Sequence, residues 1–321
     1  MTIGVNIGDL CTNTPWEPRQ ILNKLYVSRQ RNFFDCQAVK FWHSEASRIN
    51  PVIYDQSIKK VYLHMSNDEM KSMCAPQAYP NFKSWIDSNV RPIVNRFSSK
   101  EFFLVVGNEV LAPWNSDKYS SSILTALRGC FRALKDLGLG HVKVVTPLDM
   151  TCVMCSYPPS AGEFKPENVE ILRDIVRFTV NARSVICFNI YPFFARQYVS
   201  ENFALFGDDP GYIDQGRKYS NLFEAQYDSV LSAIKKLSVT GSEQLELVCT
   251  ETGWPSGGVI GASSQNMKKY IKGIKMVSER GTPLRPGPKD ILLFELYDES
   301  LKGGPEFEKF FGIFGESGEE K

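Results

Sequence analysis

Two glutamates stand where apolar runs of the sequence end. Glu251 closes the run LELVCTE and precedes Gly253-Trp254-Pro255, while Glu109 follows the run EFFLVVG. A carboxylate at the end of a buried strand is costly unless it is paired, solvated or used in chemistry. Two such carboxyls at one edge suit glycosidic bond cleavage, in which one protonates the leaving oxygen and the other attacks the anomeric carbon. A lone strand-end glutamate is more often a helix cap or an ion-pair partner, so the pair carries the prediction of a carbohydrate hydrolase.

Eight short apolar runs, rich in β-branched residues, alternate with helical stretches and must position these carboxyls. The runs cover residues 2–6, 38–42, 60–65, 101–107, 141–146, 184–191, 245–251 and 291–297. Apolar periodicity predicts helices over 81–97, 120–138, 165–182, 221–238 and 263–280. Strands this apolar are buried on both faces, as in a parallel sheet. We therefore predict an α/β fold, a closed (β/α)8 TIM barrel, with residues 1–321 as one catalytic domain.

The catalytic groups of such barrels lie at the carboxyl ends of the strands. Besides the two glutamates, the predicted strand ends carry polar and aromatic candidates: Trp42, His43, Asn108, Asn189, Tyr191 and Glu299, with Lys302 just beyond. A cleft with two carboxyls and aromatic side chains would offer flat apolar faces to sugar rings.

Charge and composition exclude several other classes of function. The 37 basic and 36 acidic side chains give a net charge of +1, which makes no electrostatic case for nucleic acid or an anionic membrane. No apolar run approaches the roughly 20 residues of a membrane helix. Of the eight cysteines, Cys187 and Cys249 lie in apolar runs and are expected in the core. Cys152 and Cys155 lack further zinc ligands nearby, so we expect loop thiols or a local bridge and no metal or cofactor.

Several motifs together resemble the plant-type β-1,3-glucanases of glycoside hydrolase family 17. The resemblance runs from about residue 3 to 314, and the motifs that carry it are GVNIGD (4–9), VVGNEV (105–110), CSYPPSAGEF (155–164), FNIYPFF (188–194), TETGWPSGG (250–258) and FELYDESLKGGPEFEKFFGIF (294–314). It implies an eightfold barrel with an open cleft and an endo-acting, retaining mechanism without a cofactor.

The resemblance also implies roles for individual residues. Glu251 looks like the nucleophile, Glu109 like the general acid/base, and Asn108 would bind the sugar 2-hydroxyl. Glu299 and Lys302 match an auxiliary pair that sets the charge and orientation of the catalytic carboxyls. The remaining candidates, which would line the site or the glucan groove, are Asn189, Tyr191, Phe194, Trp254, Trp42 and His43.

The chain departs from the family pattern at one rim. Ile7 stands where the family usually has tyrosine, and Lys40-Phe41-Trp42-His43 replaces its usual Arg-x-Tyr-Asp. His43 is either a structural rim residue or a substrate contact. Glu295 stands where the family prefers a small residue, and regular alternation would turn it into the barrel. We therefore predict an ion pair between Glu295 and Lys40.

The principal prediction is endo-hydrolysis of β-1,3-glucan, a polysaccharide or oligosaccharide substrate, by a monomer. Cleavage of β-1,3-1,4-glucan, or β-1,3-glucanosyl transfer, could use the same site. A glucan-binding or defence protein with weak catalysis is the alternative from another class. The resemblance favours an extracellular or cell-wall location, although the first residues, MTIGVNIGDL, do not read as a secretory leader.

Overall fold

Nine parallel strands form the centre of the fold. The computed structural model describes residues 2–8, 10–11, 17–31, 33–74, 78–115 and 118–321. The strands lie in the order β5-β4-β3-β2-β1-β13-β12-β9-β6. Their bounds are β1 (Thr2–Ile7), β2 (Cys36–Phe41), β3 (Lys60–Met65), β4 (Glu101–Val106), β5 (Lys143–Val145), β6 (Pro147–Asp149), β9 (Ile186–Asn189), β12 (Leu247–Thr252) and β13 (Asp290–Leu293).

The two edge strands of this sheet, β5 and β6, follow each other directly in the sequence. β5 pairs with β4, β6 pairs with β9, and only Thr146 separates β5 from β6. The two short strands are therefore halves of one barrel strand, which pairs with one neighbour through its first half and with the other through its second. Counted in this way, the strands are the eight that the sequence predicted, and the (β/α)8 barrel is confirmed.

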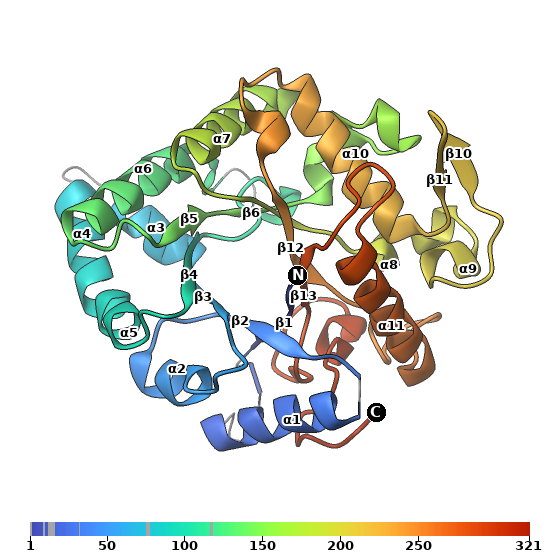
Figure 1. Ribbon diagram of the computed structural model, residues 1–321, viewed down its shortest axis with the longest axis horizontal. Coiled ribbons are helices and arrows are strands. Elements are labelled where there is room, and N and C mark those ends of the chain that lie inside the picture. Colours follow the sequence, from blue (N-terminus) through green and yellow to red (C-terminus); the bar gives the residue numbers. More distant parts are fainter. Residues whose placement is uncertain (1, 9, 12–16, 32, 75–77, 116–117) are drawn as a thin grey trace.

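Helices surround the strands in a ring (Figure 1). The main ones are α1 (Pro18–Gln30), α2 (Ala46–Ile53), α3 (Asn67–Met73), α4 (Ala78–Asn89), α5 (Arg91–Arg96), α6 (Ser120–Asp136), α7 (Val169–Asn181), α10 (Leu222–Lys236) and α11 (Ser264–Arg280). The single helix predicted over 81–97 is two, α4 and α5, which meet at Val90. Pro92 lacks the N–H that a continuous helix would use there, so the chain turns instead.

Several short helices and strands lie in the segments that connect the barrel strands to the main helices. Helix α8 (Pro192–Ala195) and α9 (Glu201–Ala204) follow β9, and two hairpins pair β7 (Val153–Cys155) with β8 (Glu163–Phe164) and β10 (Tyr212–Asp214) with β11 (Arg217–Tyr219). The β10–β11 hairpin and α9 lie outside the ring of helices, beyond α10 (Figure 1).

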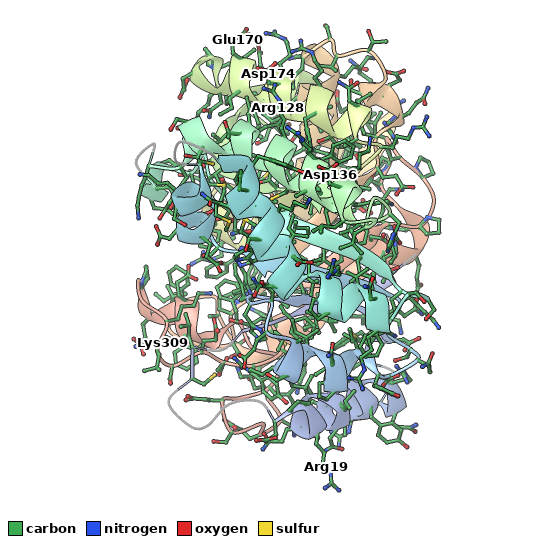
Figure 2. The ribbon with its side chains drawn as sticks, turned by 90° about the vertical axis from the view of Figure 1, so that its left-hand side faces the viewer. Arg19, Arg128, Asp136, Glu170, Asp174 and Lys309 are labelled. Carbon is green, nitrogen blue, oxygen red and sulfur yellow. The ribbon has the colours of Figure 1, made fainter. Side chains whose placement is uncertain are left out.

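The strands of the barrel are largely buried on both faces, as their apolar sequences predict. Inward-facing side chains form a small core inside the barrel, where Tyr62 and Phe103 stack with ring centres 4.2 Å apart beside Cys187. The outward-facing side chains, Cys249 among them, pack against the helices. The prediction that Cys187 and Cys249 are core thiols is confirmed. Charged side chains occupy the outer faces of the helices, among them Arg128 of α6 and Glu170 of α7 (Figure 2).

Two further expectations concern the cysteine pair and the membrane. Cys152 and Cys155 are both free thiols, so the local bridge between them is not formed. Among the helices of the described ranges, none has the length and hydropathy needed to cross a bilayer.

Candidate active site

A cleft of about 1050 Å³ opens at the carboxyl ends of the strands. Both predicted catalytic glutamates, Glu109 and Glu251, line it. Seven of the other predicted site residues line it as well: Trp42, Asn108, Asn189, Tyr191, Phe194, Glu299 and Lys302. The barrel therefore gathers side chains from five strand ends, far apart in the sequence, into one concave site.

The turn after β4 holds Glu109 in an unusual backbone conformation. Gly107 has φ +64°, and a Cβ there would lie 2.7 Å from Asn67 Oδ1, so only glycine fits. Glu109 itself has φ +52°, a left-handed conformation that costs a non-glycine residue roughly 1–2 kcal/mol. Its N–H donates to the Pro147 carbonyl at 2.9 Å, and the Ala112 N–H donates to the Glu109 carbonyl at 2.9 Å. These bonds stabilise a strained backbone at the residue predicted to be the acid.

Burial and nearby carboxyls keep Glu109 protonated. The Asn189 side-chain amide donates to Glu109 Oε1 at 2.8 Å, and Thr250 Oγ1 orients that amide by donating to Asn189 Oδ1 at 2.8 Å. Desolvation, followed by the charges of Glu251 and Asp149, raises the pKa of Glu109 to about 8. At neutral pH this carboxyl therefore carries a proton that it can donate.

Glu251 lies in the opposite electrostatic environment. It is buried at the end of β12, and the ammonium of the fully buried Lys40 lies 2.5 Å from its Oε1. The Tyr191 hydroxyl donates to Oε2 at 3.0 Å. Gly253, two residues on, lets the backbone pass close to β13, since a Cβ there would lie 2.2 Å from the Phe294 carbonyl oxygen. A cation and a hydroxyl donor together stabilise the ionised carboxylate.

The predicted ion pair between Lys40 and Glu295 is wrong, because Lys40 pairs with Glu251. The prediction required strand eight to alternate regularly through Glu295, but β13 ends at Leu293. The segment that follows pairs with the last part of the chain, where the Ile313 N–H donates to the Glu295 carbonyl at 2.8 Å. The backbone at Glu295 therefore follows this pairing and is not a regular continuation of β13.

Glu295 instead belongs to a carboxyl cluster around Lys302. The Lys302 ammonium lies 3.9 Å from Glu295, 3.9 Å from Glu299 and 3.7 Å from Glu308. Burial, and then the charge of Glu299, raises the pKa of Glu295 well above its ordinary value. Lys302 is therefore the cation that faces this cluster, whereas the buried cation beside Glu251 is Lys40.

Trp254 and His43 are not among the residues that line the cleft. Trp254 is 1% exposed, its ring packs edge-on against Phe193, and its Nε1–H donates to the Gly261 carbonyl at 2.9 Å. It supports the wall from behind and presents no face to a sugar, which corrects the prediction that it lines the site. His43 Nδ1 accepts a hydrogen bond from the Glu45 N–H at 3.2 Å, as in a structural rim residue.

Trp42 does line the cleft, but one ring face is already engaged. The Lys40 ammonium lies 4.2 Å from the centre of the indole, and His64 packs edge-on at 5.0 Å. This cation–π contact fixes the Trp42 ring beside the Lys40–Glu251 pair.

Sequence reasoning missed three side chains of the site. Lys40 was predicted to pair with Glu295, and its contact with Glu251, which joins strand ends 211 residues apart, was not predicted. Glu308 lies in the 3-10 helix η7 (Glu306–Phe310), outside every predicted strand. Asp149 ends β6, the half of the barrel strand that the prediction stopped short of. The signal that could have found Asp149 is Leu148, which continues the apolar run beyond residue 146, where the prediction ended it.

Nearly the whole length of the chain is similar to known proteins. Residues 3–321 match the family described as "Glycosyl hydrolases family 17". A basic vacuolar glucan endo-1,3-beta-glucosidase of Nicotiana tabacum is 32% identical over 98% of this chain and 82% of its own length. Glucan endo-1,3-beta-glucosidase 7 of Arabidopsis thaliana is 35% identical over 97% of this chain and 61% of its own. The structure of CJP38, a beta-1,3-glucanase and allergen of Cryptomeria japonica pollen, superposes with a TM-score of 0.88 at 29% identity, covering 100% of this chain and 97% of that one.

Proposed function

The chain belongs to family 17 of the glycosyl hydrolases, and we propose that it cleaves β-1,3-glucan internally with retention of anomeric configuration. The substrate part of this proposal is supported by the relatives from Nicotiana tabacum and Arabidopsis thaliana, which are both named glucan endo-1,3-beta-glucosidases. The open cleft of about 1050 Å³, with exposed aromatic side chains along it, suits a chain of sugars bound across the site.

One observation carries the assignment of roles: the two carboxyls of the cleft lie in opposite environments. Glu109 has its pKa raised to about 8 and holds a proton, whereas Glu251 faces the Lys40 ammonium at 2.5 Å and accepts a hydrogen bond from the Tyr191 hydroxyl. A protonated carboxyl beside a second carboxyl that is paired with a cation is the arrangement that acid and nucleophile require. Glu109 is therefore the general acid/base, and Glu251 is the nucleophile.

In the first step, Glu109 gives its proton to the glycosidic oxygen while a Glu251 oxygen attacks the anomeric carbon. The bond to the leaving sugar breaks, and a glycosyl ester forms on Glu251. The charge of Glu251, which helps to raise the pKa of Glu109, disappears in that ester. The pKa of Glu109 falls in consequence, and its carboxylate can now deprotonate the water that attacks the ester.

The side chains around the two carboxyls hold their charges and the sugar. Lys40 and the Tyr191 hydroxyl bind the Glu251 carboxylate before attack and again after the ester is hydrolysed. Asn108, whose Oδ1 lies 3.3 Å from the Asn189 amide nitrogen, is placed to bind a sugar hydroxyl beside the acid. Phe194, 48% exposed in the cleft, offers an apolar ring face to the glucan.

Turnover of soluble β-1,3-glucan, compared with β-1,3-1,4-glucan and β-1,4-glucan, tests the proposal. We expect β-1,3-glucan to be cut fastest, with a rapid fall in viscosity that shows internal cleavage. The Glu251→Ala variant, measured in the same way, is the control without the proposed nucleophile. Faster turnover of mixed-linkage glucan would reassign the substrate, and binding without turnover would favour the glucan-binding alternative. An extracellular or cell-wall location and a monomeric state remain predictions, and the relative from Nicotiana tabacum is named a vacuolar isoform.

A further inference from the structure

Two buried polar atoms on the strands beside Lys40 have no use in the proposed reaction. Within the described residues, Asn6 Oδ1 and His64 Nε2 make no hydrogen bond, although Asn6 is 0% exposed and His64 only 5%. Buried polar atoms without partners are unfavourable, and most such atoms in folded proteins are satisfied. Resting on the proposed function, we propose that Asn6 and His64 are positioning residues, which hold the Lys40 ammonium while Glu251 is esterified to the sugar.

The proposed reaction removes the partner of a buried cation. In the free protein, the fully buried Lys40 ammonium faces the Glu251 carboxylate at 2.5 Å. Once Glu251 forms the glycosyl ester, that negative charge is gone, and a buried ammonium without an anion is strongly destabilised. The glycosyl-enzyme therefore needs other electron-rich groups beside Lys40. One is the Trp42 ring, whose centre lies 4.2 Å from the ammonium.

His64 presents an acceptor nitrogen next to the same indole. Its Nδ1 lies 3.3 Å from the Trp42 carbonyl oxygen, and because a carbonyl can only accept, Nδ1 carries the hydrogen and Nε2 keeps its lone pair. The imidazole packs edge-on against the Trp42 ring, with ring centres 5.0 Å apart. Burial, and then the charge of Lys40, lowers the pKa of His64 to about 3. The imidazole is therefore neutral at pH 7 and can accept a hydrogen bond from a cation.

Asn6 presents an acceptor oxygen from the other side of Lys40. β2 lies between β3 and β1 in the sheet, and Asn6 of β1 is paired in register with Lys40 of β2. The Asn6 side-chain amide donates to the carbonyl oxygens of Thr250 on β12 and Leu293 on β13, at 3.0 and 3.2 Å. These two bonds occupy Nδ2 on the side of β12 and β13. They leave Oδ1 for a donor from elsewhere, and Lys40 is the cation next to it in register.

The groups around the ammonium are therefore of two kinds, an anion that disappears during the reaction and neutral acceptors that remain. An ammonium has three hydrogens to donate, so Lys40 can stay in place while Glu251 changes from carboxylate to ester. It then pairs with the carboxylate again when the ester is hydrolysed. No proton moves in this exchange, and neither His64 nor Asn6 is among the residues that line the cleft.

Unfolding by urea in two backgrounds tests the proposal without any turnover. Glu251→Gln keeps the shape of the side chain but not its charge, as the ester does, so the two acceptors should matter more in this background. We expect His64→Phe to raise the equilibrium constant of unfolding by a factor that is about tenfold larger in Glu251→Gln than in the wild type, the size of one hydrogen bond to a charged group. Asn6→Ala should show a difference of the same sign. His64→Gln, whose amide can supply an acceptor, should show none, and Lys40→Met should abolish the difference seen with His64→Phe.

Tyr62→Phe is the matched control. It removes another buried oxygen without a partner from β3, the strand that carries His64. Its effect on unfolding should be the same in both backgrounds. An effect of His64→Phe or of Asn6→Ala that is equal in the two backgrounds would overturn the role of that residue. A difference found in Tyr62→Phe alone would overturn both.

The rates of the two chemical steps give a second readout. With an aryl 2-deoxy-2-fluoro-β-laminaribioside, His64→Phe should slow the formation of the ester and speed its hydrolysis. The reason is that the ester loses more stabilisation than the transition states on either side, in which Glu251 keeps part of its charge. A merely structural defect would slow both steps and would contradict the proposal. If the reagent forms no ester in the wild-type protein, it is the proposed function that fails, whereas the unfolding experiment tests the contacts of Lys40 independently.

Discussion

The ammonium of Lys40 lies 2.5 Å from Glu251 Oε1, and both side chains are buried at the base of the cleft. The two residues come from β2 and β12, on opposite sides of β1 and β13 in the sheet. The pair provides the nucleophile with a counter-charge that water cannot supply at this depth. It also connects Glu251 to Trp42, whose ring centre lies 4.2 Å from the same ammonium.

Removal of the Lys40 charge should damage both stability and catalysis. Lys40→Met leaves the Glu251 carboxylate buried without a cation, a change that typically costs about 3–5 kcal/mol. We expect a lower free energy of unfolding at pH 7 and a large loss of kcat. Lys40→Arg keeps the charge and serves as the control in urea unfolding and in turnover of β-1,3-glucan. Wild-type turnover in Lys40→Met would show that the ion pair does not support the nucleophile.

The pH dependence of activity should report on Glu109. Its pKa is raised to about 8, and the acid must be protonated for the first step, so kcat/KM should decline as the pH rises through about 8. The Glu109→Gln variant should not show this decline at alkaline pH. Its rate on natural glucan should be lower than that of the wild type by a factor of about 10²–10⁴. The loss should be smaller on an aryl glycoside, whose leaving group needs little protonation. An alkaline limb that persists in Glu109→Gln would assign it to another group.

Glu295 should make stability depend on pH. Burial and the Glu299 charge raise the pKa of Glu295 above its ordinary 4.5, so its contribution to stability is complete below pH 4.5 and is lost as the pH rises. Glu295→Gln has no proton to lose. The unfolding midpoint of Glu295→Gln minus that of the wild type should therefore be larger at pH 8 than at pH 4. A midpoint difference that is the same at both pH values would contradict the raised pKa.

Lys302 should affect activity through the three carboxyls that face its ammonium. Its ammonium lies within 4 Å of Glu295, Glu299 and Glu308, so Lys302→Met leaves three carboxyls facing one another. We expect kcat to fall by about tenfold or more, equivalent to 1.4 kcal/mol in the barrier. Lys309→Met is the control, because Lys309 pairs with the exposed Glu306 at 3.1 Å, and such surface pairs contribute about 0–1 kcal/mol. Equal kinetics for the two variants would show that Lys302 has no role in the reaction.

Trp254 should matter for stability and not for sugar binding. Truncation of a fully buried aromatic side chain typically costs about 3–5 kcal/mol, so Trp254→Ala should unfold at a much lower urea concentration. Trp254→Phe keeps most of the packing and loses the hydrogen bond to the Gly261 carbonyl. Its KM for β-1,3-glucan should stay near the wild-type value. A large rise in KM in Trp254→Phe would restore the predicted substrate contact.

The sequence predicted the barrel because each strand is buried on both faces and so reads as a continuous apolar run. The two glutamates were found for the same reason, since a carboxylate stands out at the end of such a run. The partners of those glutamates were not predictable in this way. Whether Lys40 meets Glu251 or Glu295 depends on where β13 ends, and no residue pattern before Phe294 marks that end. The burial of Trp254 likewise depends on α8 and α11 packing behind it, a contact between distant segments.

The most direct test of the account is to trap the glycosyl ester. A 2-deoxy-2-fluoro-β-laminaribioside with a good leaving group should glycosylate the nucleophile, with loss of that leaving group, and slow the release of the sugar. Mass spectrometry of the digested protein should then find the added disaccharide on the peptide that contains Glu251, and no label in Glu251→Ala. A label on Glu109, or a first product of inverted anomeric configuration in NMR spectra, would contradict the assignment of Glu251 as the nucleophile.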